Sequence, residues 1–246
     1  MNQINIFDFD GTLTTDSWPK CWVWIKKVGY NGEKRNNDFE NALAEYRTTH
    51  FGDPFETFFG FFEYLLKDNN THITYEELME GEKYIDYNPG VIDFIKNTDT
   101  KNYIISCGLK EFIENLKYAN LFDDIYGTLA RYNDNGLIIG INEVFTNKKK
   151  VLAIKDILKK NNRKENDCSN VFYVGDGYFD ALAMEYVHNN GGKAIFVYQP
   201  TKDGKMDDDT KKIYETINAN NIVDYCCVAD YTAGSELYNI LEKREY

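Results

Sequence analysis

Short apolar segments alternate with amphipathic helical patterns along most of this chain, and that alternation restricts the folds open to it. The segments are rich in β-branched and aromatic residues, which favour strands. Strands that alternate with helices are typical of a parallel sheet covered by helices on both faces. We therefore expect an α/β protein with a doubly wound parallel sheet. Asn135 and Gly136, between two alternating apolar runs, add a predicted hairpin at residues 128–143. The other expected strands lie at residues 4–7, 103–105, 171–174, 194–197 and 225–229.

Residues 16–87 interrupt this alternation. Helical patterns and aromatic residues dominate there, and residues 55–66 place several phenylalanines at helical spacing. The Asn-Pro-Gly sequence at 88–90 then ends the segment and starts a new helical pattern. We expect two units: a core formed by residues 1–15 and 88–246, and a mostly helical insert at 16–87 that follows the first strand.

The charge and composition limit the class of partner. A formal net charge of −12 disfavours nucleic acid and anionic membranes, because both bind basic surfaces. No apolar run approaches the ~20 residues that a membrane span needs. The N-terminal residues lack the features of a secretion signal, and the five cysteines include no C-x-x-C motif. We expect a cytoplasmic protein, monomeric or homodimeric, that acts on a small soluble molecule.

Two acidic residues follow the first expected strand directly. Asp8 and Asp10 are alternate residues of an extended segment, so both side chains can point into one small space roughly 6–7 Å apart along the backbone. Two carboxylates there repel each other unless a cation holds them or only one is ionised. Gly11 allows the backbone to bend closely around a ligand. A calcium-binding loop does not fit, because its sixth position should be glycine and its twelfth glutamate, whereas Pro19 stands twelfth here.

Polar residues also follow two other expected strands. Ser106 ends the second and can donate to a phosphate oxygen, or it can simply form part of a turn. Asp176 lies between two glycines after the third and has an oxygen ligand suited to a hard cation. Asp180, one helical turn later, can support that site or begin a helix. Ligands of open α/β sheets bind beyond the carboxyl ends of the strands, where these residues should lie.

Three lysines, Lys148, Lys149 and Lys150, open a predicted helix. Cations at a helix N-terminus oppose the helix dipole, so we expect some local interaction to offset that cost. We favour Lys150 as the lysine that faces the site, because apolar residues follow it at helical spacing on the core side. Lys148 is the alternative.

The sequence resembles the haloacid dehalogenase superfamily, specifically its phosphoserine phosphatase-like group with a helical cap of the first type. DFDGTLT, YIISCG, KVLAIKDIL and VGDGYFD stand in the order of the four signature motifs of that superfamily. The resemblance implies a Rossmann-like catalytic core, with residues 16–87 as the cap. It departs from the group at DFDGT, where phosphoserine enzymes usually have D-x-D-S-T, and their substrate-reading Glu and Arg have no clear counterparts. We therefore do not expect phosphoserine as the substrate.

The resemblance implies roles for the acidic residues. Asp8 would be the nucleophile, and Asp10 the general acid that protonates the leaving oxygen and then the base that activates water. Mg²⁺ would be held by Asp8, the backbone carbonyl of Asp10 and Asp176, with Asp180 supporting this metal cluster.

It also implies how the phosphoryl group is held. Thr12 and Ser106 would bind its oxygens, and Lys150 would pair with Asp8 and the phosphate. Gly11 and Cys107 would lie beside it, Cys107 either as a packing residue or through its backbone N–H.

Candidates for substrate contact in the cap are Arg47, His50, Trp18, Lys26 and Lys27, of which Arg47 is our choice.

The expected function is hydrolysis of a small phosphorylated metabolite, a phosphomonoester, with Mg²⁺ and an aspartyl-phosphate. A phosphomutase, a phosphonate hydrolase with a cap lysine such as Lys26 or Lys27, and a non-catalytic phosphate-binding relic remain alternatives. A dehalogenase is not expected, because dehalogenases do not need the acid at Asp10.

Overall fold

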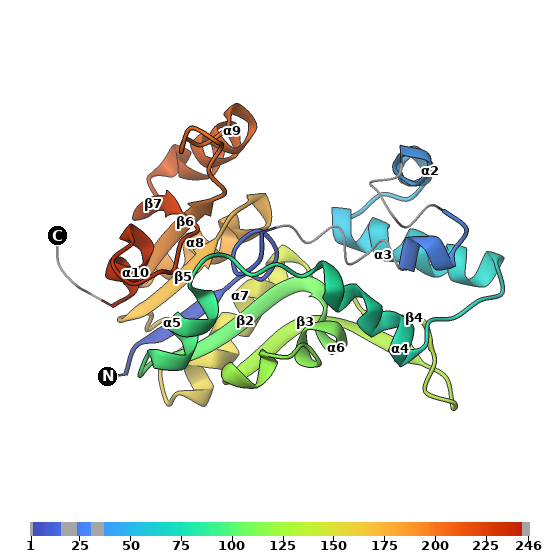
Figure 1. Cartoon of the computed structure of the whole chain (residues 1–246), viewed down its shortest axis with the longest axis horizontal. Helices are drawn as coiled ribbons and strands as arrows, with labels where there is room; N and C mark the ends of the chain where they lie inside the picture. Colours follow the sequence, from blue (N-terminus) through green and yellow to red (C-terminus); the bar gives the residue numbers. More distant parts are fainter. Residues whose placement is uncertain (1, 16–23, 31–36, 243–246) are drawn as a thin grey trace.

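The computed structural model describes residues 2–15, 24–30 and 37–242. Within these residues, seven strands form one sheet in the order β4-β3-β2-β1-β5-β6-β7 (Figure 1). All neighbouring strands pair in parallel except β3 and β4, which form the predicted antiparallel hairpin. The strands are β1 (Ile4–Phe7), β2 (Lys101–Leu109), β3 (Asp124–Tyr132), β4 (Ile138–Glu143), β5 (Val171–Gly175), β6 (Lys193–Tyr198) and β7 (Tyr225–Val228).

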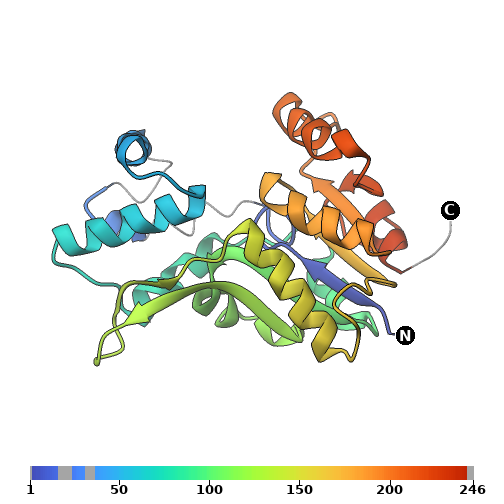
Figure 2. The same ribbon diagram turned by 180° about the vertical axis from the view of Figure 1, so that it is seen from behind.

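Helices cover both faces of this sheet. Side chains alternate along β1, so Ile4 and Ile6 enter one buried cluster and Phe7 enters the other. Helices α5 (Val91–Asn97), α6 (Lys110–Glu114) and α10 (Glu236–Leu241) supply apolar residues to the cluster that contains Phe7. Helices α7 (Asn147–Lys160), α8 (Ala181–Asn189) and α9 (Asp208–Ile217) supply the other. Figure 2, seen from behind, has α7 and α8 in front of the sheet. The predicted doubly wound α/β fold is confirmed.

The segment between β1 and α5 is largely helical where the structure describes it. It holds α2 (Asn37–Thr49), α3 (Pro54–Asp68), α4 (Tyr75–Met79) and the 3-10 helix η1 (Glu80–Tyr84). The core adds the short 3-10 helices η2 (Ala119–Leu121), η3 (Tyr178–Asp180) and η4 (Asn218–Asn220). We call the helical segment between β1 and α5 the cap.

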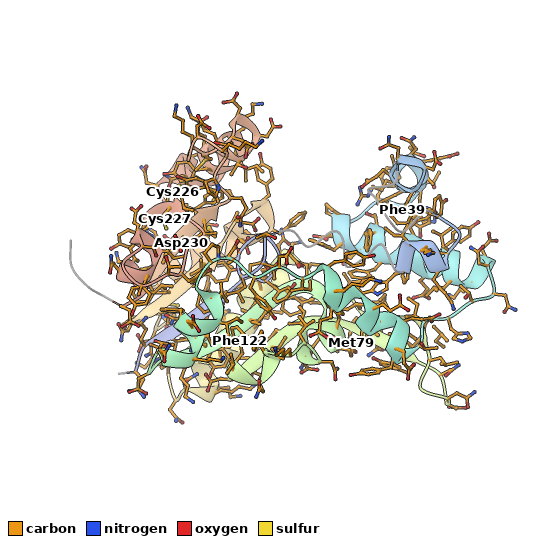
Figure 3. All side chains as sticks on the ribbon, in the orientation of Figure 1. Phe39, Met79, Phe122, Cys226, Cys227 and Asp230 are labelled. Atoms are coloured by element: carbon orange, nitrogen blue, oxygen red, sulfur yellow. The ribbon has the colours of Figure 1, made fainter. Side chains whose placement is uncertain are left out.

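Helix α3 is the longest helix in the described part of the cap. It begins at an N-cap aspartate, Asp53, whose side chain accepts a hydrogen bond from the Phe55 N–H, and Glu56 completes a capping box. Its apolar face packs on Phe39 of α2, which Figure 3 labels in the cap, on the opposite side of the molecule from Cys226 and Cys227 of β7.

The cap also packs on the core. An antiparallel bridge joins Ile73 to Ile138 of β4, so the β3–β4 hairpin extends beneath α3 (Figure 1). Met79 of α4 and Phe122, both labelled in Figure 3, pack against one hydrophobic cluster that runs from the sheet into α3. Cap and core share this hydrophobic cluster, so the packing marks no border between them. The boundaries between core and cap at residues 15 and 87 stay a prediction. No helix in the described part of the chain is both long and apolar enough to cross a membrane.

Candidate active site

Strands β1, β2 and β5 are neighbours at the centre of the sheet, so their carboxyl ends meet. The register pairs Phe7 with Ile104 and with Val174, and the backbone N–H of Asp8 donates to the Val174 carbonyl at 2.9 Å. Residues that follow these three strands are therefore held at one edge of the sheet, where open α/β sheets bind their ligands.

The first turn of α7 brings a buried lysine to this edge. The Lys150 ammonium donates to Oδ1 of Asp8 and to Oδ1 of Asp180, both at 2.7 Å, and the side chain is 1% exposed. Burial by itself would lower the pKa of Lys150, but the charges of Asp180 and Asp8 outweigh it and raise that pKa well above its ordinary value. Lys148 is exposed, and Lys149 pairs with Glu143.

Asp180 has hydrogen-bond donors at both carboxylate oxygens. Besides Lys150, its Oδ1 accepts the Tyr173 hydroxyl at 2.6 Å. Its Oδ2 accepts the backbone N–H groups of Asp176 at 3.2 Å and Gly177 at 3.1 Å. This residue therefore ties the lysine of α7 to the loop that follows β5.

Three carboxylates form what we call the acidic cluster: Asp8, Asp176 and Asp180 each have an oxygen within 4.8 Å of the other two. The space for Asp176 depends on Gly11, whose φ is +77°, since a Cβ there would lie 2.0 Å from Oδ2 of Asp176. Gly11 is thus required both by its left-handed backbone and by this close approach.

The acidic cluster carries more negative charge than Lys150 can balance. Burial raises the pKa of Asp8 to about 7; the charges of Asp180 and Asp10 add to the rise, and Lys150 opposes it. Burial, together with the charges of Asp8 and Asp180, raises the pKa of Asp176 well above its ordinary value. A divalent cation would offset this excess charge, and carboxylate oxygens are the ligands that Mg²⁺ prefers. The residues therefore fit a divalent metal site.

Two hydroxyl groups lie on the segments that line this edge. Oγ1 of Thr12 is buried and has no hydrogen-bond partner among the described residues. Oγ of Ser106, which is also buried, accepts the Gly108 N–H at 2.9 Å and retains its own proton for donation. A buried hydroxyl without a partner is costly, and an anionic ligand oxygen would satisfy it. Burial raises the pKa of the neighbouring Cys107 thiol to about 12, so this side chain is neutral.

A family model described as haloacid dehalogenase-like hydrolase matches residues 6–185, well over half of the chain. The chain belongs to this family. The match begins near the end of β1 and includes the cap, β2, α7 and the loop after β5, so Asp8, Lys150, Asp176 and Asp180 all lie inside it. A comparison with curated proteins gave no match.

Solved structures of haloacid dehalogenase-like hydrolases and related proteins share the fold. A substrate-bound phosphoserine phosphatase matches with a TM-score of 0.63 and 16% identity, over 99% of this chain and 98% of its own. A probable phosphoserine phosphatase from Vibrio cholerae gives 0.63 and 15%, over 98% of this chain and 64% of its own. A protein of unknown function from Bordetella pertussis gives 0.61 and 12%, over 92% and 99%. At these identities the similarity establishes the fold alone.

The cap reaches the site at the start of α3. The Phe55 ring packs edge-on against Phe179 of η3, with centroids 4.5 Å apart. Arg47 is occupied within the cap, since its guanidinium donates to Oγ1 of Thr57 and to the Pro54 carbonyl, both at 3.0 Å. Its predicted contact with substrate stays a prediction, and the structure gives it a second task in holding α2 against the first turn of α3.

The other cap candidates are dispersed. His50, which follows the last residue of α2, stacks on Tyr46 of that helix. Lys26 and Lys27 line a cavity of about 380 Å³ beside Trp24, where Lys27 pairs with Glu77. Trp18 lies outside the described residues.

Three polar residues near the site were missed from the sequence. Gln199, after β6, donates to the Gly11 carbonyl at 3.2 Å and to Asn88 at 2.9 Å, and Asn88 donates to the Thr12 carbonyl at 2.8 Å. Tyr173 was assigned to a core strand only. In the sequence, Asn88 and Gln199 stand out only by their places at a turn and at a strand end. Tyr173 gave a clearer signal, because it is a tyrosine in an otherwise apolar strand.

Proposed function

We propose that the protein is a Mg²⁺-dependent phosphohydrolase that cleaves a phosphomonoester of a small metabolite through an acyl phosphate on Asp8. The observation that carries the proposal is the pairing of Asp8 with a fully buried, protonated Lys150 inside the acidic cluster. An aspartate alone repels a phosphate. An aspartate flanked by an ammonium and a metal site can approach one.

The residues divide the reaction into two displacements. In the first, a carboxylate oxygen of Asp8 attacks phosphorus, the bond to the ester oxygen breaks, and Asp10, as general acid, gives a proton to that leaving oxygen. In the second, Asp10 takes a proton from water, the water oxygen attacks the same phosphorus, and Asp8 and inorganic phosphate are released. Lys150 keeps its proton in both steps and balances charge on Asp8 and the phosphoryl oxygens.

The metal would be held by Asp8, Asp176 and the backbone carbonyl of Asp10, and would supply positive charge next to the phosphoryl oxygens. Thr12 and Ser106 would donate their hydroxyl protons to those oxygens. Lys27 is paired with Glu77, which leaves it unsuited to the free amine chemistry of a phosphonate hydrolase.

The direct test is release of inorganic phosphate from a panel of sugar phosphates, phospho-amino acids, phosphocholine-like compounds and nucleotides. We expect hydrolysis of at least one class, loss of activity with EDTA, and recovery with added Mg²⁺. Asp8→Asn should abolish turnover while the protein still folds, and Asp134→Asn, at an exposed hairpin residue, is the matched control. Equal cleavage by the protein and by Asp8→Asn would show that Asp8 is not the nucleophile.

A further inference from the structure

Tyr173 is a buried tyrosine in the middle of β5. Its side chain is 0% exposed and lies in the apolar cluster formed with α7 and α8. A phenylalanine would fill such a site equally well, and burying a hydroxyl costs free energy unless it is hydrogen-bonded. The Tyr173 hydroxyl makes that bond to Oδ1 of Asp180 at 2.6 Å. Burial, with the charge of Asp180 adding to it, raises the pKa of Tyr173 well above its ordinary value, so the hydroxyl remains a donor.

The oxygen that accepts this bond is the one that holds Lys150. Oδ1 of Asp180 receives the Lys150 ammonium at 2.7 Å from one element and the Tyr173 hydroxyl from another. Two donors from α7 and β5 therefore fix one oxygen, and the same ammonium reaches Asp8. The position of Lys150 relative to Asp8 depends on where Asp180 is held.

The other half of the Asp180 carboxylate is fixed by the metal loop. Oδ2 accepts the backbone N–H groups of Asp176 and Gly177, and a Cβ at Gly175 would lie 2.4 Å from Cγ of Asp180. The Asp180 carboxylate therefore packs closely against the backbone of Gly175. A rotation of Asp180 would disturb Lys150 on one side and the backbone of Asp176 on the other.

We propose that Tyr173 is a positioning residue that acts through Asp180, and so keeps both Lys150 and the Asp176 loop in place for phosphoryl transfer. The proposal rests on the proposed function. Tyr173 does not touch the substrate or the metal. Its hydroxyl restrains the Asp180 carboxylate, which lies between the Lys150 side chain and the Asp176 loop. Hydrogen-bond partners of this kind typically contribute ~10–100-fold to activity or metal affinity.

The test compares Tyr173→Phe with Tyr103→Phe. Tyr103 lies on β2, which β1 separates from β5. It is buried in the same cluster, and its hydroxyl accepts a bond from Asn161 at 2.9 Å, away from Asp180. Both changes remove one buried hydroxyl. We expect Tyr173→Phe to lower kcat by ~10–100-fold, to change KM little, and to raise the Mg²⁺ concentration for half-maximal activity. Tyr103→Phe should change none of the three, although both variants should lose similar thermal stability.

A second comparison shows whether the effect passes through Asp180. In an Asp180→Asn background, Tyr173→Phe should lower kcat much less than it does in the unmodified protein, because residues that act as a unit are not additive. Titration of each protein with Mg²⁺ and beryllofluoride, followed by calorimetry, gives the same comparison without turnover. Full additivity, or equal behaviour of Tyr173→Phe and Tyr103→Phe, would overturn the proposal while leaving the phosphatase intact. An unmodified protein that neither hydrolyses a phosphomonoester nor binds beryllofluoride would instead overturn the proposed function, and this inference with it.

Discussion

Buried charge dominates the site at the scale of single residues. Lys150 is enclosed with Asp8 and Asp180, and desolvating an ion is tolerated only where opposite charge and hydrogen bonds compensate it. The lysines that open α7 oppose the helix dipole, and these acidic partners offset that cost. Lys150 is therefore coupled both to the stability of the fold and to Asp8, the proposed nucleophile.

Replacing this lysine should affect both. Lys150→Met should abolish phosphate release, because Asp8 then approaches phosphate without a neighbouring cation. It should also lower the free energy of unfolding at neutral pH by about 3–5 kcal/mol, the usual effect of removing one partner from a buried ion pair. Chemical denaturation and a phosphate-release assay measure the two effects. Lys148→Met, at an exposed residue of the same turn, should change stability by less than about 0.5 kcal/mol. Similar results for both variants would contradict the assignment of Lys150.

Asp10, the proposed general acid and base, can be tested separately through its effect on kcat. Asp10→Asn keeps the shape of the side chain and removes its proton transfer, so kcat should fall by ~10²–10⁴-fold. The loss should be smaller for an activated aryl phosphate, whose leaving group needs less protonation. Steady-state kinetics with an alkyl and an aryl phosphate distinguish the two, and an equal loss on both would exclude Asp10 as the general acid.

At this scale the sequence predicted which residues would lie together where chemistry and strand position coincided, and their catalytic roles stay a prediction. Asp8, Asp176 and Lys150 each follow a strand end or open a helix beside an apolar face, and the structure brings all three together. Tyr173 and Gln199 could not be assigned, because their partners come from segments that only the folded chain brings near.

At the scale of elements, α3 connects the cap to the sheet at both of its ends. Phe55 contacts Phe179 near the site, and Glu63 binds the β3–β4 hairpin. Glu63 accepts Arg131 at 2.7 Å and the Ile141 N–H at 3.1 Å. Burial opposes ionisation of Glu63, but hydrogen bonds from Lys67, the Ile141 N–H and Arg131 outweigh it and lower its pKa to about 2. The hairpin was predicted from Asn135 and Gly136, whereas its contact with the cap had no local sequence signal.

The Glu63 link should stabilise the protein in a pH-dependent way. Its folded pKa of about 2 lies below the ordinary value of 4.5, so its contribution is present above pH 4.5 and is lost as the pH falls towards 2. Glu63→Gln should lower the free energy of unfolding by about 1–3 kcal/mol at neutral pH, and the difference should shrink in acid. Urea denaturation across pH measures it. Glu80→Gln, whose pair with Lys83 is exposed at 3.9 Å, should have almost no effect. A constant difference at every pH would exclude the charge of Glu63 as the cause.

At the scale of the whole molecule, a chain with a net charge of −12 needs a local arrangement of positive charge to hold an anionic ligand. The sheet was predictable, because alternating strands and helices leave few other architectures. The place of β3 beside β2 and the continuous packing between cap and core were not, since both depend on long-range contacts. Negative charge is concentrated in the acidic cluster, where the carboxylates repel one another. A bound metal cation would offset that repulsion.

Mg²⁺ should therefore stabilise the protein more at higher pH. The pKa of Asp8 is raised from 3.8 to about 7 in the folded protein. Without metal, the contribution of protonated Asp8 to the free energy of unfolding is therefore fully present below pH 3.8 and is lost as the pH rises through 7. Protons compete with Mg²⁺ for the same carboxylates. Thermal unfolding should show a larger increase in Tm with Mg²⁺ at about pH 8 than at about pH 5. Asp176→Asn should remove most of that increase. An equal increase at both pH values, or one that survives Asp176→Asn, would place the metal elsewhere.

The most direct test of the central claim is to locate the phosphoryl group on the protein during turnover. The protein is mixed with Mg²⁺ and a phosphomonoester that it cleaves, quenched in acid, and treated with borohydride, which reduces an acyl phosphate to the alcohol. Peptide mass mapping then identifies the converted residue. We predict homoserine at position 8 and none in Asp8→Asn; a modified residue other than Asp8, or normal turnover with no converted residue, would contradict the account.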